Sequence, residues 1–340
     1  MKTKISQICC NCVLPDTFPG ISFDSTGRCN FCKDDPSVKD KFLELKNIMD
    51  IAIESRKSFG RYDCVVAYSG GKDSTFTLKL LIETYGLKCL AVTIDNGFIS
   101  EQAKKNCDAV TSMLGVDHFV FKPSTDFMNN MFVQSVRNKD IHSNASIKRA
   151  SCICNSCINL INIQMIKFAL QNDVPIVAGG YIGGQVPKDA AIMDIDLSML
   201  NYTRKAMQSK YQEYLGEIAM KYMQLPVEFL ERSLIKKLLI INPMLTVKAT
   251  EEKIINEIKP LGWTKTSDTG NNSSNCRLND LGIAIHYHQY GFNPYVFEIS
   301  EQIRNGLIDR DTALEKVNYI PEFADVLWQA QRIGLNLNDI

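Results

Sequence analysis

The feature that most constrains this chain is a short apolar run that leads directly into a glycine pair and then into a helix-forming segment. The run is Asp63-Cys-Val-Val-Ala-Tyr68, the turn is Ser69-Gly-Gly-Lys-Asp-Ser74, and residues 75–85 follow with apolar side chains at helical spacing. A short apolar run bounded by turn residues is typical of a strand buried in a parallel sheet. Adjacent glycines let backbone amides approach an anion closely, and the next helix adds free N–H donors and its dipole. The sequence therefore predicts a phosphate-binding turn.

The same alternation of strand and helix continues along the chain. The pattern predicts strands at 63–68, 88–94, 118–121 and 175–178, and helices at 38–58, 75–85, 101–114 and 158–171. Alternation of this kind is typical of an α/β fold with a doubly wound parallel sheet, whose ligands bind at the carboxyl ends of the strands. We therefore expect the loops at 69–74, 95–97 and 179–185 to face one crevice.

The turn matches neither the Walker A motif nor the dinucleotide-binding glycine motif. It resembles the PP-loop motif, S-G-G-x-D-S/T, of ATP pyrophosphatases, with a complete match at Ser69, Gly70, Gly71, Asp73 and Ser74. A HUP-like PP-loop fold is what this resemblance implies.

The PP-loop resemblance also implies roles for residues. The loop, including Lys72, would hold the β- and γ-phosphates of ATP, which is cut between the α- and β-phosphates to leave AMP on the substrate and release pyrophosphate. Asp73 would be a catalytic residue that helps to place Mg²⁺, and Asp95 lies where the family commonly contacts the nucleotide. Gly179 follows a predicted strand and could line the crevice by close backbone approach, or belong to a flexible loop. The alternative for the turn itself is a plain glycine-rich connection.

Four N-terminal cysteines form a second constraint. Cys9 and Cys12 pair with Cys29 and Cys32 as two C-x-x-C units, a spacing that suits a closed tetrahedral Zn²⁺ site. The segment has too few large apolar residues to fold on a core of its own, so a metal would stabilise it. Cys10 could replace Cys9 as a ligand, and reduced cysteines without metal are the alternative.

The segment from Cys9 to Cys32, with Leu14-Pro15-Asp16-Thr17, Phe23-Asp24 and Gly27, resembles the start of N-acetyl sugar amidotransferases. The likeness extends through the PP-loop and weakens after about residue 125. It implies conversion of a sugar acetamido group to an acetamidino group, with ammonia from a partner glutaminase.

A second cysteine group lies just before the helix predicted at 158–171. It contains Cys152, Cys154 and Cys157, and Cys276 follows much later. The spacing leaves four interpretations open: an iron–sulfur cluster, persulfide chemistry, a second zinc site, or buried thiols without a reaction.

This group resembles that of iron–sulfur-dependent tRNA thiolation enzymes, another PP-loop branch. The resemblance implies that Cys154, Cys157 and Cys276 are catalytic ligands of a 4Fe–4S cluster whose fourth iron binds sulfide. Cys152 would be a spare or competing ligand.

Composition restricts the function further. The 38 basic residues balance the 38 acidic ones, which favours a small-molecule substrate over tRNA because RNA binding usually needs a basic face. The N-terminus has no apolar signal segment, and no apolar run approaches the roughly 20 residues that span a bilayer. We therefore expect a cytoplasmic protein without a membrane partner, in which 12 cysteines serve metal or catalytic roles.

Three segments follow from these patterns. They are a zinc knuckle at 1–36, a PP-loop ATP pyrophosphatase domain at 37–195 and a mainly helical region at 196–340. The helices of 295–340 are expected to pack on a partner domain or on a second copy of the chain, as in a homodimer.

The function predicted first is an ATP-dependent sulfurtransferase. It would adenylate a carbonyl oxygen of a nucleobase or similar amide and replace that oxygen with sulfur, using ATP, Mg²⁺, Zn²⁺ and a 4Fe–4S cluster. The alternative is amidotransfer to an N-acetyl sugar. A sulfur-donor protein or a glutaminase is the partner that each resemblance implies. An ATP-binding scaffold without catalysis is a weaker third hypothesis.

Overall fold

The sheet has six strands in the order β3-β2-β1-β4-β6-β5. This computed structural model describes all residues except 1–4, 34–37, 58–59, 196, 226–237 and 340. The strands are β1 (Cys64–Ala67), β2 (Cys89–Ile94), β3 (Asp117–Phe121), β4 (Ile176–Ala178), β5 (Ile192–Asp194) and β6 (Leu239–Ile241). All neighbours are parallel except β5, which pairs antiparallel with β6 at the edge. The predicted α/β fold is confirmed, and the sheet takes β6 from beyond residue 195.

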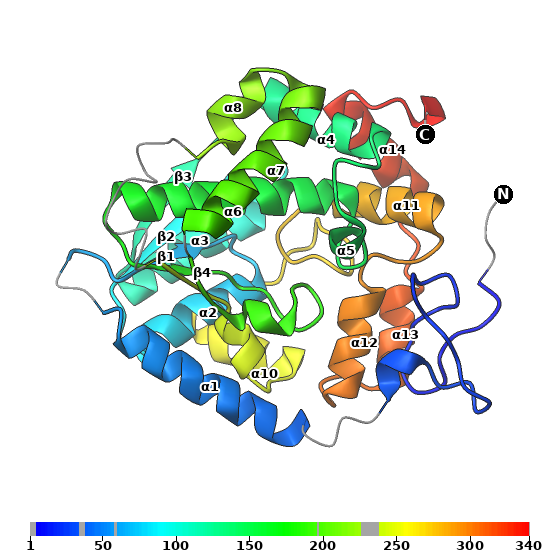
Figure 1. Ribbon diagram of the computed structural model, residues 1–340, viewed down its shortest axis with the longest axis horizontal. Helices are drawn as coiled ribbons and strands as arrows, with labels where there is room; N and C mark the ends of the chain where they lie inside the picture. Colours follow the sequence, from blue (N-terminus) through cyan, green and yellow to red (C-terminus); the bar gives the residue numbers. More distant parts are fainter. Residues whose placement is uncertain (1–4, 34–37, 58–59, 196, 226–237, 340) are drawn as a thin grey trace.

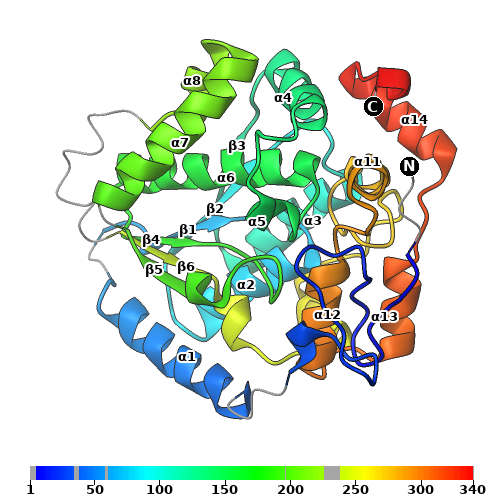
Figure 2. The same ribbon diagram turned by 45° about the vertical axis from the view of Figure 1, so that its right-hand side comes forward.

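Helices cover both faces of the sheet, as Figures 1 and 2 show. The helices are α1 (Val38–Glu54), α2 (Lys72–Glu83), α3 (Glu101–Leu114), α4 (Thr125–Arg137), α5 (Asn144–Ile147), α6 (Cys152–Gln171), α7 (Leu197–Leu215), α8 (Ile218–Met223), α10 (Glu251–Ile258), α11 (Asn279–Tyr290), α12 (Val296–Arg304), α13 (Arg310–Val317) and α14 (Phe323–Ile333). Side chains alternate along each strand, so β1 contributes to two cores. Val65 belongs to the core that contains side chains of α4, α6, α7, α8, α11 and α14, whereas Cys64 and Val66 belong to the core that contains side chains of α1, α2, α3 and α10.

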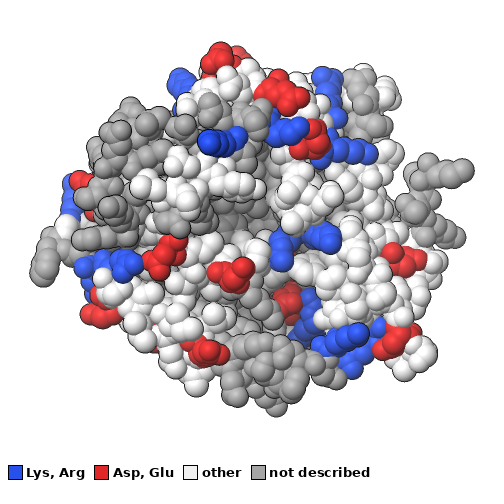
Figure 3. All heavy atoms as spheres, viewed as in Figure 1, with Lys and Arg blue, Asp and Glu red and all other residues white. Residues whose placement is uncertain are grey.

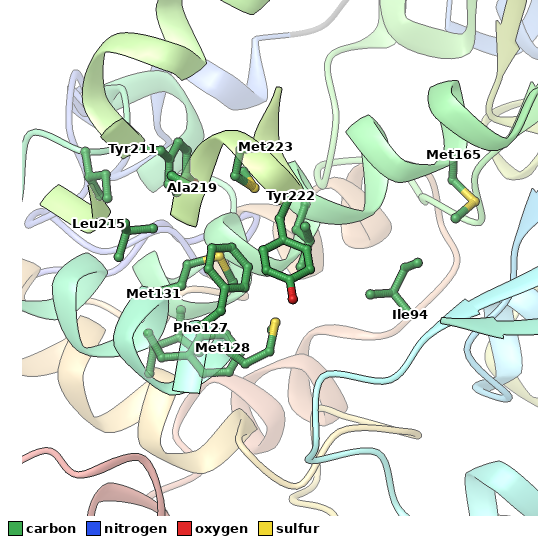
Figure 4. Close-up of a cluster of buried hydrophobic side chains, with 14 of the residues drawn as sticks. Ile94, Phe127, Met128, Met131, Met165, Tyr211, Leu215, Ala219, Tyr222 and Met223 are labelled. Atoms are coloured by element: carbon green, nitrogen blue, oxygen red, sulfur yellow. The ribbon is translucent and has the colours of Figure 1, made fainter. Parts of the chain in front are cut away.

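The first face holds the larger core. Figure 4 shows Phe127, Met128 and Met131 of α4 directed toward Tyr222 and Met223 at the end of α8. The rings of Phe127 and Tyr222 stack with centroids 4.2 Å apart. This packing holds α4 and α8 beside the central helix α6, whose start forms part of the site described below.

Helix α6 begins six residues earlier than the helix predicted at 158–171, so the second cysteine group lies inside the helix and not before it. The cause is a cap: Ser151 accepts a hydrogen bond from the Cys154 backbone N–H, which satisfies one of the amides left free at a helix start. Within the described part of the chain, α6 alone is long and apolar enough to cross a membrane. It is a core helix, with 61% of its apolar window buried.

The N-terminal cysteine segment packs on α12 and α13 rather than standing apart (Figure 2). Phe18 stacks on Phe297 of α12 with centroids 5.3 Å apart. At the start of α13, the Arg310 guanidinium donates to the Cys9 carbonyl at 3.1 Å and to the Cys12 carbonyl at 3.3 Å. The segment is therefore joined to the helical C-terminal region.

Candidate active site

The segment Ser69–Ser74 follows β1, as the sequence predicts, and its conformation depends on glycine. Its last three residues already form the start of α2, which begins at Lys72 and not at residue 75. Gly70 has a φ of +70°, and a Cβ built there would lie 2.1 Å from the Ala103 carbonyl oxygen. The Gly70 carbonyl accepts hydrogen bonds from Trp263 Nε1 at 3.0 Å and from Asn106 Nδ2 at 3.3 Å. Two side chains thus turn this carbonyl into the protein, which keeps a repulsive oxygen away from a bound anion.

Serine hydroxyls contact backbone amides of the PP-loop, two of which lie at the start of α2. Ser274 Oγ accepts from the Lys72 N–H at 3.1 Å, Ser69 Oγ accepts from the Gly71 N–H at 3.4 Å, and Ser74 Oγ accepts from the Ser69 N–H at 3.3 Å. A hydroxyl can rotate, so a phosphate oxygen can share or replace these contacts at a helix N-terminus, where anions are favoured.

The two carboxylate oxygens of Asp73 differ, because one contacts Lys72 and the other has no hydrogen-bond partner among the described residues. Lys72 Nζ contacts Asp73 Oδ2 at 2.7 Å, whereas Asp73 Oδ1 is buried and has no hydrogen-bond partner among the described residues. Burial lowers the pKa of Lys72, but the charges of Asp73, Glu251 and Glu298 outweigh burial and hold it above the ordinary value. A buried carboxylate oxygen without a partner is a suitable Mg²⁺ ligand.

A cavity of about 290 Å³ opens at the carboxyl ends of β1 and β2, and we call it the cysteine cavity. The three loops predicted to share a crevice all reach it. Ser69, Asn96 and Gly180 are among its lining residues. A Cβ on Gly180 would lie 3.0 Å from Ser74 Cα, so glycine permits the close approach of the loop after β4 to the PP-loop.

Two predicted ligands lie one position away from the residues that line this cavity. Asp95 Oδ1 accepts from the Gly97 N–H at 2.9 Å, and its neighbour Asn96 lines the cavity. Gly179 packs against Asn242, where a Cβ would meet Oδ1 at 2.5 Å, and its neighbour Gly180 lines the cavity. The roles of Asp95 and Gly179 stay predictions.

Cys154, Cys157 and Cys276 all line the cysteine cavity. The first two come from the first two turns of α6, and Cys276 comes from a C-terminal segment that forms an antiparallel bridge with Ile99 after β2. Asn96 Nδ2 lies 3.6 Å from Cys157 Sγ and 3.8 Å from Cys276 Sγ. Residues distant in sequence are thus gathered beside the PP-loop.

These thiols are held in their neutral form. Burial raises the pKa of Cys157 to about 12 and that of Cys276 to about 11, and it also raises the pKa of Cys154. A bound metal would deprotonate them. Cys152 differs, because this first residue of α6 is buried in the core with 2% exposure and is not among the residues that line the cavity. Its part as a spare or competing ligand stays a prediction.

The N-terminal cysteines form a compact group. The Sγ atoms of Cys9, Cys12, Cys29 and Cys32 all lie within 4.8 Å of one another, and this is the only such metal-binding group found in the described part of the chain. The Cys12–Cys29 and Cys9–Cys32 distances are 3.7 Å and 4.0 Å. A zinc ion with Zn–S bonds of about 2.3 Å separates its four sulfurs by roughly 3.8 Å. The donor set therefore fits Zn²⁺, and Cys10 is exposed, which removes it as a substitute for Cys9.

We expect Cys29→Ser to lose zinc and at least about 3 kcal/mol of stability, because zinc binding by thiolates contributes directly to folding free energy. Metal analysis and thermal unfolding measure both effects. Cys10→Ser, at the exposed position of the same segment, is the matched control and should change neither. Retention of zinc by Cys29→Ser would contradict the site.

The cavity wall includes a buried acid that sequence reasoning missed. Glu298 of α12 accepts from Gln185 Nε2 at 3.0 Å and from Gln302 Nε2 at 3.2 Å. Burial raises its pKa to about 7, against the opposing effects of Gln185 and Lys72. No local pattern marks this residue, since it reaches the PP-loop only through tertiary packing. The polar run before Cys276, which includes Ser274, was the available signal for the rest of this wall.

The raised pKa of Glu298 gives a pH-dependent stability. The Glu298 carboxyl binds its proton more tightly in the folded protein than in the unfolded chain, where its pKa is 4.5. The fold therefore loses stability as the pH rises from 4.5 to 7, and above pH 7 the loss stays constant. We expect Glu298→Gln to be more stable than wild type at pH 8.5 by up to about 3 kcal/mol, with a smaller difference at pH 5.5. Urea unfolding at both pH values measures this. Glu252→Gln, at an exposed position of α10, is the control, and a pH-independent difference would contradict the expectation.

The comparisons with known proteins agree with this geometry at the level of the superfamily. Residues 63–216 match the family model of the argininosuccinate synthase N-terminal HUP domain. The matched segment, which is less than half of the chain, is similar to a domain of the adenine nucleotide alpha hydrolase-like (HUP) type, in agreement with the strand, PP-loop and helix at 64–83.

Individual relatives are distant. An uncharacterized protein of Methanocaldococcus jannaschii is 24% identical over 295 residues, which cover 86% of this chain and 85% of the relative. The U34-tRNA thiolase NcsA from Methanococcus maripaludis, solved with its 4Fe–4S cluster, is 12% identical with a TM-score of 0.35, and 94% of this chain and 91% of that chain are covered. NMN synthetase from Francisella tularensis is 14% identical with a TM-score of 0.39, covering 88% and 97%. With TM-scores below 0.5, neither structural likeness supports an inference about activity.

Proposed function

We propose that this protein is an ATP-dependent sulfurtransferase that adenylates a carbonyl oxygen of a nucleobase-like amide and replaces that oxygen with sulfur. The single observation that carries this proposal is the cysteine cavity itself. It places Cys154, Cys157 and Cys276 in the same cavity as Ser69, Gly71 and Asp73 of the PP-loop. A sulfur source and an activating nucleotide would therefore meet at one substrate.

The residues of this chain support the first half-reaction, which is adenylation of the substrate. The amides and hydroxyls at the start of α2 would bind the triphosphate, and Asp73 Oδ1 would bind its Mg²⁺. A carbonyl oxygen is a poor leaving group, and bonding it to the α-phosphate makes AMP the leaving group instead. The largely apolar walls of Ile94, Ile153 and Ile161 would exclude water from the adenylated carbonyl.

The donor set also fits a 4Fe–4S cluster. Cys154, Cys157 and Cys276 line one cavity, whereas Cys152 is buried and is not among its lining residues. Cys154, Cys157 and Cys276 would hold the cluster, leaving one iron without a protein ligand. When bound, such an iron supplies a site that holds sulfide. Asn96, close to two of the sulfurs, would orient those ligands.

Small substrates are favoured over tRNA. Among the described residues on the face shown in Figure 3, groups of Lys and Arg are interspersed with Asp and Glu. The chain has a net charge of zero. A partner that delivers sulfur, a cytoplasmic location and a homodimer remain proposals. The homodimer is supported by Ile320, just before α14, and by Phe323, its first residue, which are 83% and 70% exposed.

Amidotransfer would use the same adenylation and would differ only in the nucleophile. The test therefore offers sulfide and ammonia to the protein in the same reaction. The test incubates protein purified without oxygen with ATP, Mg²⁺, radioactive sulfide and labelled ammonia, in separate reactions with a small-molecule extract and with bulk tRNA. We expect ATP-dependent sulfur incorporation in the small-molecule fraction. Nitrogen incorporation without sulfur would overturn sulfur transfer and establish the amidotransferase alternative, and labelling of tRNA would overturn the substrate class.

A further inference from the structure

Glu298 of α12 differs from the other acids near the PP-loop, because it is buried without a cation beside it. The residue is 8% exposed. Among the described residues its carboxyl makes no ion pair, and its two hydrogen bonds come from neutral amides, those of Gln185 and Gln302. Glu301, three residues later on the same helix and equally buried, pairs with Arg304 at 2.7 Å. An unpaired buried carboxyl is costly, and groups of this kind are concentrated at functional sites.

The Glu298 carboxyl is held in one orientation. Gln185 Oε1 accepts from the Ile182 N–H at 3.1 Å, which turns Nε2 of the same amide toward Glu298 Oε2 at 3.0 Å. Gln302 Nε2 donates to the other carboxylate oxygen at 3.2 Å. Gly184 lets the loop after β4 lie directly on α12, because a Cβ there would be 2.4 Å from Glu298 Cα. Each carboxylate oxygen keeps a further lone pair that could accept a proton.

Glu298 lines the cysteine cavity together with residues of the PP-loop, and the other titratable groups in the described lining are poorly suited to act as a base. Asp73, the other carboxyl there, contacts Lys72 and would bind Mg²⁺, and Arg149 stays protonated. Burial raises the pKa of the tyrosines and thiols in the lining, so these groups hold their protons at neutral pH. They are Tyr68, Tyr181, Tyr295, Cys154, Cys157 and Cys276. Glu298 is therefore the group in this lining that can take a proton.

The charged groups around Glu298 leave its pKa near neutrality. Burial raises this pKa to about 7, against the opposing charges of Lys72 on α2 and Lys316 on α13, whereas the charge of Asp73 adds to the increase. Tyr295, immediately before α12, also faces Glu298, and burial holds its own pKa well above the ordinary value. A carboxyl that titrates near neutral pH can accept a proton in one step and return it in a later one.

Adenylation of an amide requires that a proton leave the substrate. As the carbonyl oxygen bonds to the α-phosphorus, the bond from that phosphorus to the bridging oxygen of pyrophosphate breaks, and its electron pair leaves with pyrophosphate. The amide N–H bond breaks in the same half-reaction, and its electron pair forms the C=N bond of the adenylated product. When sulfide then adds to this carbon, the nitrogen takes a proton back and AMP leaves with the electron pair of the C–O bond. One group can serve as base in the first step and as acid in the second.

We propose that Glu298 is the catalytic base of adenylation, which takes the amide proton of the acceptor and returns it to the same nitrogen when sulfide adds. This inference rests on the proposed function, because it takes the acceptor to lie in the cysteine cavity. It also narrows the substrate class, since the reacting carbonyl must adjoin an N–H, as in a lactam or a secondary amide. An ester, or an amide fully alkylated on nitrogen, would not react by this route. Helix α12 would thereby take a direct part in catalysis.

The test measures ATP-dependent pyrophosphate release by full-length wild type, Glu298→Gln and Glu301→Gln, with the small-molecule extract, at pH 6 and pH 8. The wild type should be about tenfold faster at pH 8, because a group with a pKa of about 7 is mostly protonated at pH 6. Glu298→Gln should be at least about a hundredfold slower than wild type at pH 8 and lose the pH dependence, with the KM for ATP within about twofold of wild type. Glu301→Gln, the matched control outside the described lining of the cysteine cavity, should keep the rate and its pH dependence.

Two further measurements separate catalysis from a structural role. Glu298→Ala leaves space for a small carboxylate, so added formate should restore its pyrophosphate release by about tenfold or more. Glu298→Gln should also unfold at a higher urea concentration than wild type at pH 8.5, since it removes a buried charge, whereas loss of a structural contact would lower that concentration.

A wild-type rate or an unchanged pH dependence in Glu298→Gln would overturn the inference. A slow and less stable Glu298→Gln, together with a Glu298→Ala that formate does not restore, would overturn it as well. Pyrophosphate release that depends on Glu298 as described, without any sulfur incorporation, would count against sulfur transfer only. Sulfur incorporation at the wild-type rate in Glu298→Gln would count against this inference only.

Discussion

Asp73→Asn is expected to reduce ATP-dependent pyrophosphate release by about a thousandfold. The substitution keeps the shape of the side chain but removes the charge that would hold Mg²⁺ at the buried Oδ1. It also leaves the Lys72 ammonium, now 2.7 Å from Oδ2, without its carboxylate partner. A coupled pyrophosphate assay with the small-molecule extract measures the effect.

Asp311→Asn provides the control, because Asp311 also lies in the first turn of a helix but on α13. It should release pyrophosphate at the wild-type rate. Release that persists in Asp73→Asn while the protein remains folded would show that the PP-loop does not bind the triphosphate as described.

Cys276→Ser is expected to abolish sulfur incorporation while leaving pyrophosphate release largely intact. Serine replaces the thiol with a group of similar size, so the bridge to Ile99 should survive. A serine hydroxyl cannot replace a thiolate as an iron ligand or as a sulfur carrier. Radioactive sulfide incorporation and pyrophosphate formation, measured in the same reaction, separate the two half-reactions.

Cys152→Ala is the matched control, since Cys152 lies at the start of α6 near Cys154 and Cys157 in sequence but is not among the residues that line the cysteine cavity. It should retain sulfur incorporation. If Cys152→Ala lost transfer and Cys276→Ser kept it, the assignment of the three sulfur ligands would be wrong.

Much of the fold was predictable because its signals are local. Apolar runs bounded by turn residues predicted the ends of β1 and β2 to within one residue. Helix α3 begins after the N-cap Ser100 and ends before the C-cap Gly115, at the bounds that the sequence predicted. Helix α4 is absent from the sequence-based assignment, although Phe127 and Met131 carry helical spacing. The PP-loop was also predictable from a local signal, because its motif is six consecutive residues, Ser69 to Ser74.

The remainder of the site depends on contacts that no local pattern encodes. Alternation along β2 decides that Asn96 rather than Asp95 lines the cysteine cavity, and this needs the register of the loop to within one residue. Trp263 reaches the Gly70 carbonyl from 193 positions away. Glu298 joins the wall because α12 packs between the N-terminal cysteine segment and the PP-loop. Such placements follow from the assembled core and not from any short segment.

Sulfur transfer as proposed requires that three cysteines beside the PP-loop hold an iron–sulfur cluster. Iron, sulfide and zinc analysis of anaerobically purified wild type and Cys276→Ser tests this requirement. We expect about four irons, about four sulfides and about one zinc per wild-type chain, and a Cys276→Ser protein that loses the iron and keeps the zinc. Wild-type protein with one or two zinc ions and no iron would contradict it.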